Sequence, residues 1–272
     1  MKNIRNAAVA GIFYPASADK LKNDIQFLLN SNKPDQEFNN VAGIISPHAG
    51  YFYSGNTAAY AFNVVKGKKY STVIIISPSH REYFPGICIY DGDGYSTPLG
   101  IVQINKEMRK ALTFENNLIF QGVKGHGDEH AVEVQIPFLQ MVLKDFTIVP
   151  IIIGDQSKEY VFGLAEKLST VMNDETLIIA SSDLSHFYTK AEAHKLDSQI
   201  EKRIESFDYE GLQSDFDNKK CEACGGGGIV ALMKAGDLKG KNRSKVLSLS
   251  DSGDVTNDDS EVVGYLSAVV YG

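Results

Sequence analysis

The chain has 272 residues, which is enough for one large domain or two small ones with a sizeable core. Its formal net charge of −7 and the lack of any Lys/Arg block argue against a nucleic-acid partner, because phosphate binding needs a clustered basic surface. The apolar runs are too short to span a bilayer or to form a signal peptide, so we expect no membrane partner and a cytoplasmic location.

Apolar periodicity predicts alternating helices and strands. In the first half, the predicted elements are a helix over 16–30 capped by Ser17, a strand from 41 that ends at 46–47, a helix to about 65, a strand from 72 that ends at 77–78, short strands at 86–90 and 101–104, a helix at 105–112 and a helical segment at 131–143. In the second half, they are a strand at 146–153, a helix at 159–172, a strand at 177–180, a helix at 190–207, a helix that opens at the glycines 225–228, and strands at 246–249 and 262–270.

This order of elements predicts a single α/β domain with helices on both faces of the sheet. Strand, helix and strand in succession near the N-terminus favour parallel strands joined by a crossover. The strands at 86–90 and 101–104 can form an antiparallel edge, so we expect a mixed, mostly parallel sheet. Pro137 must kink its helix or lie near the first turn, and the acidic segment 251–260 is typical of a solvated loop.

Three strand-like runs each deliver a histidine at the same end. His48 follows VAGIISP, His80 follows TVIIISPS and His186 follows LIIASSDLS. Open α/β sheets place ligands just past the carboxyl ends of their strands, and in a parallel sheet those ends converge. Imidazole is the commonest neutral metal ligand and is also suited to proton transfer near pH 7. We therefore predict a metal centre or an acid/base site, with hydrogen-bonded structural histidines as the alternative.

Cys224 can complete this site. It precedes a glycine-rich helix start, where unpaired backbone N–H groups and the helix dipole favour an anion, so we expect its thiol to ionise more readily than a free one. A thiolate there can ligate a metal or attack an electrophile. The alternative is a redox pair with Cys221, although no thioredoxin-like context surrounds the two cysteines. An odd number of cysteines also argues against a disulfide framework.

Further candidates lie near these motifs. His130 and Glu133 are three residues apart, so on a helix they would share a face and can bind metal or relay protons, with a solvated helix start as the alternative. Asp183 can orient His186 or cap a turn. The remaining residues of these types are expected outside the site, with His126 and His194 at the surface and Cys88 in the core.

The motifs SPHAGY, SPSH, DEHAVEVQIPF, SSDLSH and CGGGGIVAL together resemble the Memo-like family, whose prokaryotic members are called AmmeMemoRadiSam system protein B. They occur in the family's order from His48 to about Met233, and GYLSAVVY near the end also fits. The resemblance implies that residues 1–272 form one three-layer αβα sandwich. That fold is similar to the class III extradiol dioxygenases, which open catechol rings with non-haem iron.

The resemblance also implies roles for particular residues. His48, His80 and Cys224 match the positions of the metal ligands, with Fe(II) expected first and Cu or Zn as alternatives. His186 matches the acid/base histidine of the dioxygenases, and His130 lies near the same cleft. A thiolate replaces the carboxylate of the dioxygenases, so ring opening cannot be inherited from the fold alone. Radical-SAM and AMMECR1-like partner proteins are implied as well.

Three functional hypotheses follow. The first is a dioxygenase-like, non-haem iron oxidoreductase acting on an unknown small substrate, in which His186 moves a proton with help from Asp183 or His130. The second is a non-catalytic module whose cleft binds a peptide or protein segment. The third is a metal-assisted hydrolase in which His186 or Glu133 activates metal-bound water.

Overall fold

The computed structural model describes residues 3–113 and 118–272. The strands, in chain order, are β1 Ile4–Arg5, β2 Val41–Ser46, β3 Thr72–Pro78, β4 Ile87–Tyr90, β5 Gly94–Thr97, β6 Gly100–Gln103, β7 Ile119–Gly122, β8 Thr147–Ile153, β9 Thr176–Ser181, β10 His186–Tyr188, β11 Arg243–Asp251 and β12 Val262–Tyr271. The helices are α1 Ala18–Ser31, α2 Tyr51–Val65, α3 Lys106–Leu112, α4 Gln135–Val142, α5 Lys158–Val171, α6 Lys190–Glu205, α7 Tyr209–Asp217, α8 Gly226–Leu238 and α9 Gly253–Thr256.

The large sheet is mixed, as predicted. Its strand order is β10-β12-β2-β9-β3-β8-β4-β7, and β11 also pairs with β12. The neighbours β2, β9, β3 and β8 are parallel, whereas β12 and β4 run antiparallel to β2 and β8. Because the central strands are parallel, their carboxyl ends lie at one edge of the sheet.

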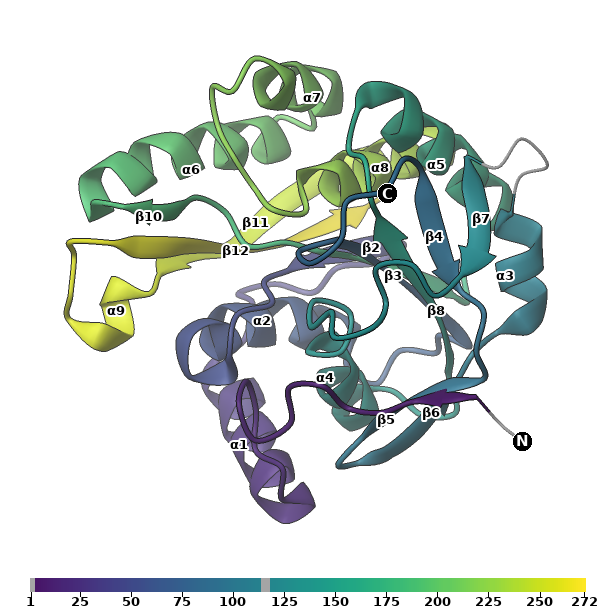
Figure 1. Ribbon diagram of the computed structural model, residues 1–272. Coiled ribbons are helices and arrows are strands. Elements are labelled where there is room, and N and C mark those ends of the chain that lie inside the picture. The colour runs from purple at the N-terminus through teal and green to yellow at the C-terminus, as the bar shows by residue number, and fades with distance from the viewer. Residues whose placement is uncertain (1–2, 114–117) are drawn as a thin grey trace.

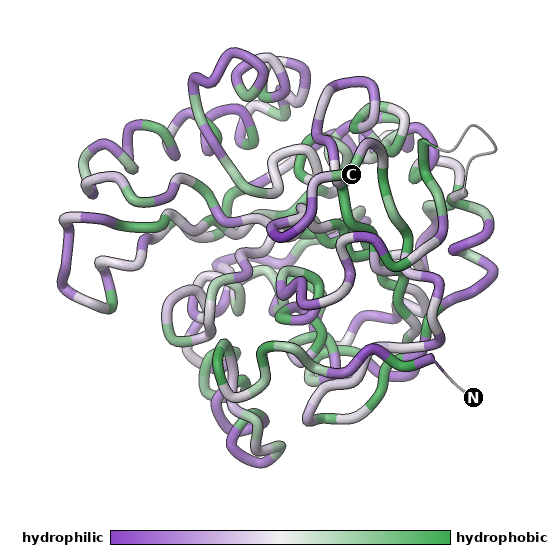
Figure 2. The backbone as a smooth tube through the Cα atoms, viewed as in Figure 1, coloured by the Kyte–Doolittle hydropathy of each residue, from purple (hydrophilic) through white to green (hydrophobic). Residues whose placement is uncertain are grey.

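Helices cover both faces of this sheet and form a three-layer α/β fold (Figure 1). Successive side chains of a strand point to opposite faces, so Val73 and Ile75 of β3 enter one core while Ile74 and Ile76 enter the other. The first core includes side chains of α1, α2 and α4, and the second includes those of α5, α6, α7 and α8. Hydrophobic residues follow the central strands, and hydrophilic stretches lie on α1, α6 and α7 (Figure 2). Burial of each of these isoleucine side chains stabilises the folded state by about 1.5–3 kcal/mol.

The predicted antiparallel edge is wrong. β4 is buried at every position and lies inside the large sheet between β8 and β7. β6, by contrast, pairs with β5 in a separate sheet that also contains β1. The loop expected between the two strands therefore contains a strand of its own, which the glycine-rich sequence concealed.

Other elements refine the predictions. Ser17 caps α1 through a hydrogen bond from the Lys20 backbone N–H, as predicted. Pro137 is the third residue of α4, near the first turn, where a missing N–H costs little. The acidic segment is not simply a solvated loop, because it contains α9 and begins at Asp251, which is buried beside Lys190. Within the described ranges, we find no helix that is both long enough and apolar enough to cross a membrane.

A buried ion pair ties the N-terminal segment to the turn that precedes α4. Arg5 Nη1 lies 2.7 Å from Glu133 Oε2, and both side chains are almost fully buried. Glu133 also accepts hydrogen bonds from the Tyr14 hydroxyl and from the backbone N–H groups of Ala8 and Val9. All these donors lie near the beginning of the chain, so the carboxylate fixes that segment against the body of the domain.

We expect Glu133→Ala to lower the free energy of unfolding by about 3–5 kcal/mol, because it leaves the Arg5 guanidinium buried without its counter-ion. Urea denaturation followed by circular dichroism measures the loss. The matched control is Asp24→Ala, which breaks an exposed pair with Lys20 and should cost under about 1 kcal/mol. Equal losses in the two variants would show that the buried pair has no special structural role.

Candidate metal centre

Three neighbouring parallel strands bring the site together. In the sheet, β9 lies between β2 and β3. His48, Asp183 and His80 each come two residues after the last residue of β2, β9 and β3, respectively. Cys224 comes from the segment directly before α8, which is far from β2 and β3 in the sequence. The structure therefore places the first two strand-end histidines together, as the convergence of parallel strand ends predicts.

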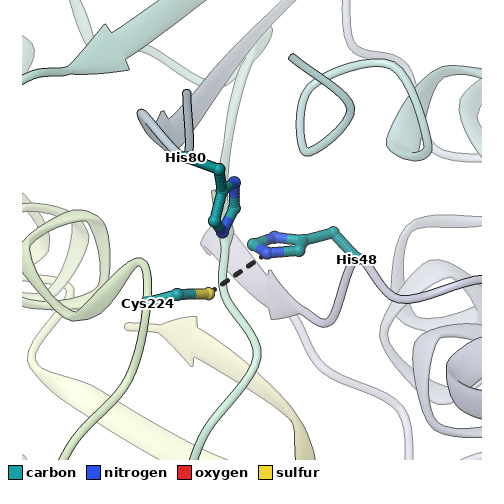
Figure 3. A group of neighbouring side chains, drawn as sticks. All are labelled: His48, His80 and Cys224. Atoms are coloured by element: carbon teal, nitrogen blue, oxygen red, sulfur yellow. Dashed lines mark hydrogen bonds between the residues drawn. The ribbon is translucent and has the colours of Figure 1, made fainter. Parts of the chain in front are cut away.

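His48, His80 and Cys224 form a compact trio (Figure 3). One donor atom from each side chain can be chosen so that all three lie within 4.8 Å of one another. His48 Nε2 is 3.1 Å from Cys224 Sγ, and the rings of His48 and His80 meet edge to face at 5.0 Å. His48 is buried, whereas the side chain of His80 is 28% exposed, so the trio is open to solvent on the His80 side.

The hydrogen bonds of Ser181 fix the proton on His48. Ser181 Oγ lies 2.7 Å from the carbonyl oxygen of Ala131, which can only accept, so the single hydroxyl proton is donated there. Oγ accepts from Gln135 Nε2, and the remaining contact, 2.9 Å from His48 Nδ1, requires that Nδ1 donate. The lone pair of His48 is then on Nε2, the nitrogen that faces Cys224.

Glu129 orients the ring of His80. The carboxylate accepts from His80 Nδ1 at 2.9 Å and from the backbone N–H of His80 at 2.7 Å. It also accepts from the backbone N–H groups of His130 and Ala131. Burial opposes ionisation of Glu129, but these hydrogen bonds outweigh it and lower the pKa of Glu129 to about 2. A carboxylate thus accepts from His80 Nδ1 and orients the ring, an arrangement common around metal-ligating histidines, which then bind the ion through Nε2.

A close approach between α8 and β9 positions Cys224. A Cβ atom at Gly225 would overlap the carbonyl oxygen of Ser181, so only glycine allows the start of α8 to lie against the end of β9. Asp183 and Cys224 meet there, with the backbone N–H of Asp183 donating to Cys224 Sγ at 3.2 Å. Gly225, directly after Cys224, is therefore required by packing at the site.

The expectation that Cys224 ionises readily is wrong for the protein without a bound cation. Burial, followed by the nearby Asp183 carboxylate, raises the pKa of the Cys224 thiol. Backbone N–H groups at the start of α8 do not offset this, because the side chains of Ser182 and Gln156 accept from them. The thiol therefore keeps its proton and can donate it to Nε2 of His48, whose pKa burial lowers well below its usual value.

Asp183 contacts the trio through His48. Its Oδ1 accepts from the backbone N–H of His48 at 2.7 Å, and its Oδ2 lies 4.0 Å from His48 Nε2. Burial raises the pKa of Asp183 to about 7. Among the described residues, the hydrogen bonds of this carboxylate come from the chain beside His48, and its predicted role in orienting His186 remains a prediction.

A cavity of about 460 Å³ lies beside the trio, and His130, Asp183 and His186 line it. The ring of His130 stacks on that of His80 at 4.7 Å, and its pKa is lowered to about 4 by burial. Burial also lowers the pKa of His186. Both imidazoles are therefore neutral at pH 7 and line the cavity as proton acceptors.

Two predictions about neighbouring residues are wrong. Residues 131–134 form turns ahead of α4, so His130 and Glu133 do not share a helical face, and Glu133 is bound to Arg5 instead. His126 is buried rather than at the surface, with its ring nitrogens bonded to the Tyr95 hydroxyl and a backbone carbonyl.

The other cysteines and the last histidine lie outside the trio. His194 is largely exposed and Cys88 is fully buried, as predicted. Cys221 is a buried free thiol, so it and Cys224 do not form a disulfide in this structure.

Sequence reasoning missed the residues that orient the two imidazoles. Glu129 stands inside the motif DEH, and a carboxylate next to a predicted metal site was a usable signal. The role of Ser181 could not be predicted from the sequence, because its contact with His48 depends on the register that pairs Ser181 with Ser46 across β9 and β2. Gln135 reaches Ser181 from another segment again.

The donor set fits a divalent transition metal. Two imidazole Nε2 atoms and one thiol sulfur lie around a common point, and the hydrogen bonds of both Nδ1 atoms can stay in place when a cation binds. Only the contact between the Cys224 thiol and His48 Nε2 must be given up, with loss of the thiol proton. Metal–nitrogen and metal–sulfur bonds of about 2.0–2.3 Å separate neighbouring ligand atoms by roughly 3–4 Å, close to the spacing found here. Imidazole and thiolate together favour iron, copper or zinc over magnesium or calcium.

The fold and the site define the class: an α/β protein with histidine and cysteine donors gathered at the carboxyl ends of parallel strands. A sequence model described as Memo-like protein matches residues 5–269, so the chain belongs to the Memo-like family. The identification suggested by the sequence motifs is thereby confirmed.

The chain is similar over nearly its whole length to curated members of this family. A MEMO1 family protein from Thermoplasma acidophilum is 39% identical, covering 97% of this chain and 98% of its own. Relatives from Thermotoga neapolitana and Nitrosopumilus maritimus are 36% and 35% identical, with 96% or more of each chain covered. A crystal structure of an uncharacterized protein from Escherichia coli K12 is matched with a TM-score of 0.47 and 11% identity, over 74% of this chain and 85% of that one, and this likeness carries no further argument.

We expect Glu129→Gln to weaken binding of Zn²⁺ or Fe²⁺ by about 10–100-fold, because the charged acceptor that orients His80 is lost. Competition against a chromogenic chelator measures the affinity, and circular dichroism checks the fold. The neighbouring, exposed Asp128→Asn removes the same charge without touching His80 and should bind metal like the parent chain. Unchanged affinity in Glu129→Gln would contradict the orienting role.

Proposed function

We propose that the protein is a metal-dependent oxidoreductase of the dioxygenase-like type, which holds Fe(II) at His48, His80 and Cys224. The observation that carries the proposal is the arrangement of the trio: each imidazole is hydrogen-bonded through Nδ1, which leaves the two Nε2 atoms as the nitrogens that can bind a cation together with Cys224 Sγ. A cavity that ends beside these residues offers room for a small substrate. Cu and Zn are the alternatives for the same donor set.

Fe(II), when bound, supplies redox chemistry and open positions for substrate and oxygen. The chain's own residues supply proton transfer and orientation. Neutral His186 lies on the cavity wall and accepts a proton from a substrate hydroxyl, while His130 and Asp183 lie on the same wall to assist. Burial of His48 excludes water from the inner side of the centre.

The structure bears differently on the two other hypotheses. In the metal-assisted hydrolase, Glu133 cannot serve as the general base, because its carboxylate is already bound by Arg5 and Tyr14. A peptide-binding role is favoured by the largely exposed rings of Phe52 and Phe187, the second of which lines the cavity. Radical-SAM and AMMECR1-like proteins, suggested by the family resemblance, are candidate partners under either role.

Metal analysis tests the ligand set. Protein purified without oxygen and loaded with Fe(II) is expected to hold stoichiometric metal, and His48→Ala and Cys224→Ser are expected to hold little, since each removes one of three donors. Inductively coupled plasma mass spectrometry measures the content. His194→Ala and Cys221→Ser remove the same groups outside the trio and should keep their metal. Full metal content in both site variants would mean that the assignment is wrong.

Oxygen uptake tests the reaction. With a panel of catechols, the Fe(II)-loaded protein is expected to consume oxygen, and His186→Asn should slow uptake by about 10²–10⁴-fold because the proton acceptor is lost. Its metal content should stay at the parent level, since His186 is not among the proposed ligands. Metal-replete protein that consumes no oxygen with any catechol would favour the binding role instead.

A further inference from the structure

The cavity beside the trio has a distinct chemical character. Aromatic side chains form much of its wall, including Phe13, Tyr53, Phe187 and Tyr265. Tyr265 is buried, whereas Tyr53 and Phe187 are 42% and 71% exposed. Such surfaces favour a flat ring, which can stack or meet them edge to face.

The backbone at Phe187 adopts an uncommon conformation. Its φ of 63° lies in the left-handed region, which bulky side chains rarely adopt and which costs of order 1–3 kcal/mol. The pairing of β10 with β12 is irregular between His186 and Tyr188, so the strand bulges at this residue. The bulge turns an exposed aromatic ring to the cavity mouth directly beside His186.

The charge around the cavity is one-sided. Asp258 and Glu261 line it together with the buried Asp183, and within the described chain no lysine or arginine is among its lining residues. Asp258 is ionised, because hydrogen bonds from Ser260 lower its pKa. The nearby Lys190 is held by Asp254 at 2.7 Å and also lies close to Asp251 and Asp259. Arg81 does not line the cavity, although its positive charge contributes to the lowered pKa of His130.

We propose that this cavity selects an aromatic ligand carrying a positively charged amine, an aryl-alkyl ammonium, over one carrying a carboxylate. The ring lies among the aromatic side chains, and the ammonium faces Asp258 and Glu261 at the opening. This inference rests on the proposed function for its meaning as substrate choice, but the ligand preference itself depends on the cavity alone.

Binding of three probes of matched shape tests the preference without involving metal chelation. The probes are 2-phenylethylamine, 2-phenylethanol and 3-phenylpropanoate, and their dissociation constants are measured by ligand-observed NMR. The amine is expected to bind about tenfold more tightly than the acid at low salt, with the alcohol between them. The difference should shrink from about 0.01 M to about 1 M salt, as the Debye length falls from roughly 30 to 3 Å.

A pair of double variants locates the effect. Asp258→Asn with Glu261→Gln should weaken the amine about fivefold and leave the alcohol unchanged, because only the charge at the opening is removed. Asp35→Asn with Glu37→Gln makes the same chemical changes on a different surface and should affect no probe.

Three outcomes overturn the proposal: the acid binds as tightly as the amine, none of the probes binds, or both double variants act alike. Metal content is measured on the same samples, so a protein that holds Fe(II) but shows no amine preference refutes the ligand class and leaves the proposed metal site standing. A protein that prefers the amine but holds no metal supports the ligand class and refutes the proposed metal site.

Discussion

Hydrogen bonds to the Nδ1 atoms of the two central histidines determine the geometry of the site. A buried imidazole such as that of His48 must find an acceptor for the nitrogen that carries its proton. Ser181 accepts from His48, and Glu129 accepts from His80, so both protons are held on Nδ1. The opposite nitrogens are left facing the same point as the Cys224 thiol. The register between β2 and β9 and the segment before α4 hold these two acceptors in place.

The large sheet provides that support through its parallel centre. β2, β9 and β3 end at one edge and supply two histidines and the turn that contains Asp183. Glycine at position 225 then lets α8 begin within contact of β9. A fold that hosts many chemistries thus acquires its particular donor set from short segments just past the strand ends.

Much of this could be predicted from the sequence, for a physical reason. β2, β3 and β9 are continuous apolar runs because both faces of the central sheet are covered, and such runs are visible without any structure. His48 and His80 follow directly from where these runs end. β4 is equally apolar, but its partners could not be predicted, because pairing depends on segments elsewhere in the chain.

The errors share one cause, which is contact between distant parts of the sequence. Glu133 looked like a site residue until Arg5, 128 positions earlier, proved to be its partner. His126 looked exposed until Tyr95 supplied a buried hydroxyl. Cys224 looked acidic until burial and the Asp183 carboxylate, both provided by distant segments, raised the pKa of its thiol. Local pattern alone carries no information about any of these partners.

The turn after β9 holds two of the three donors at once. Asp183 accepts from the backbone of His48 with its side chain and donates to Cys224 with its own N–H, whereas His80 is held separately by Glu129. Asp183 therefore couples the positions of His48 and Cys224. A substitution at Asp183 is expected to displace two donors together, although this residue supplies no ligand atom of its own.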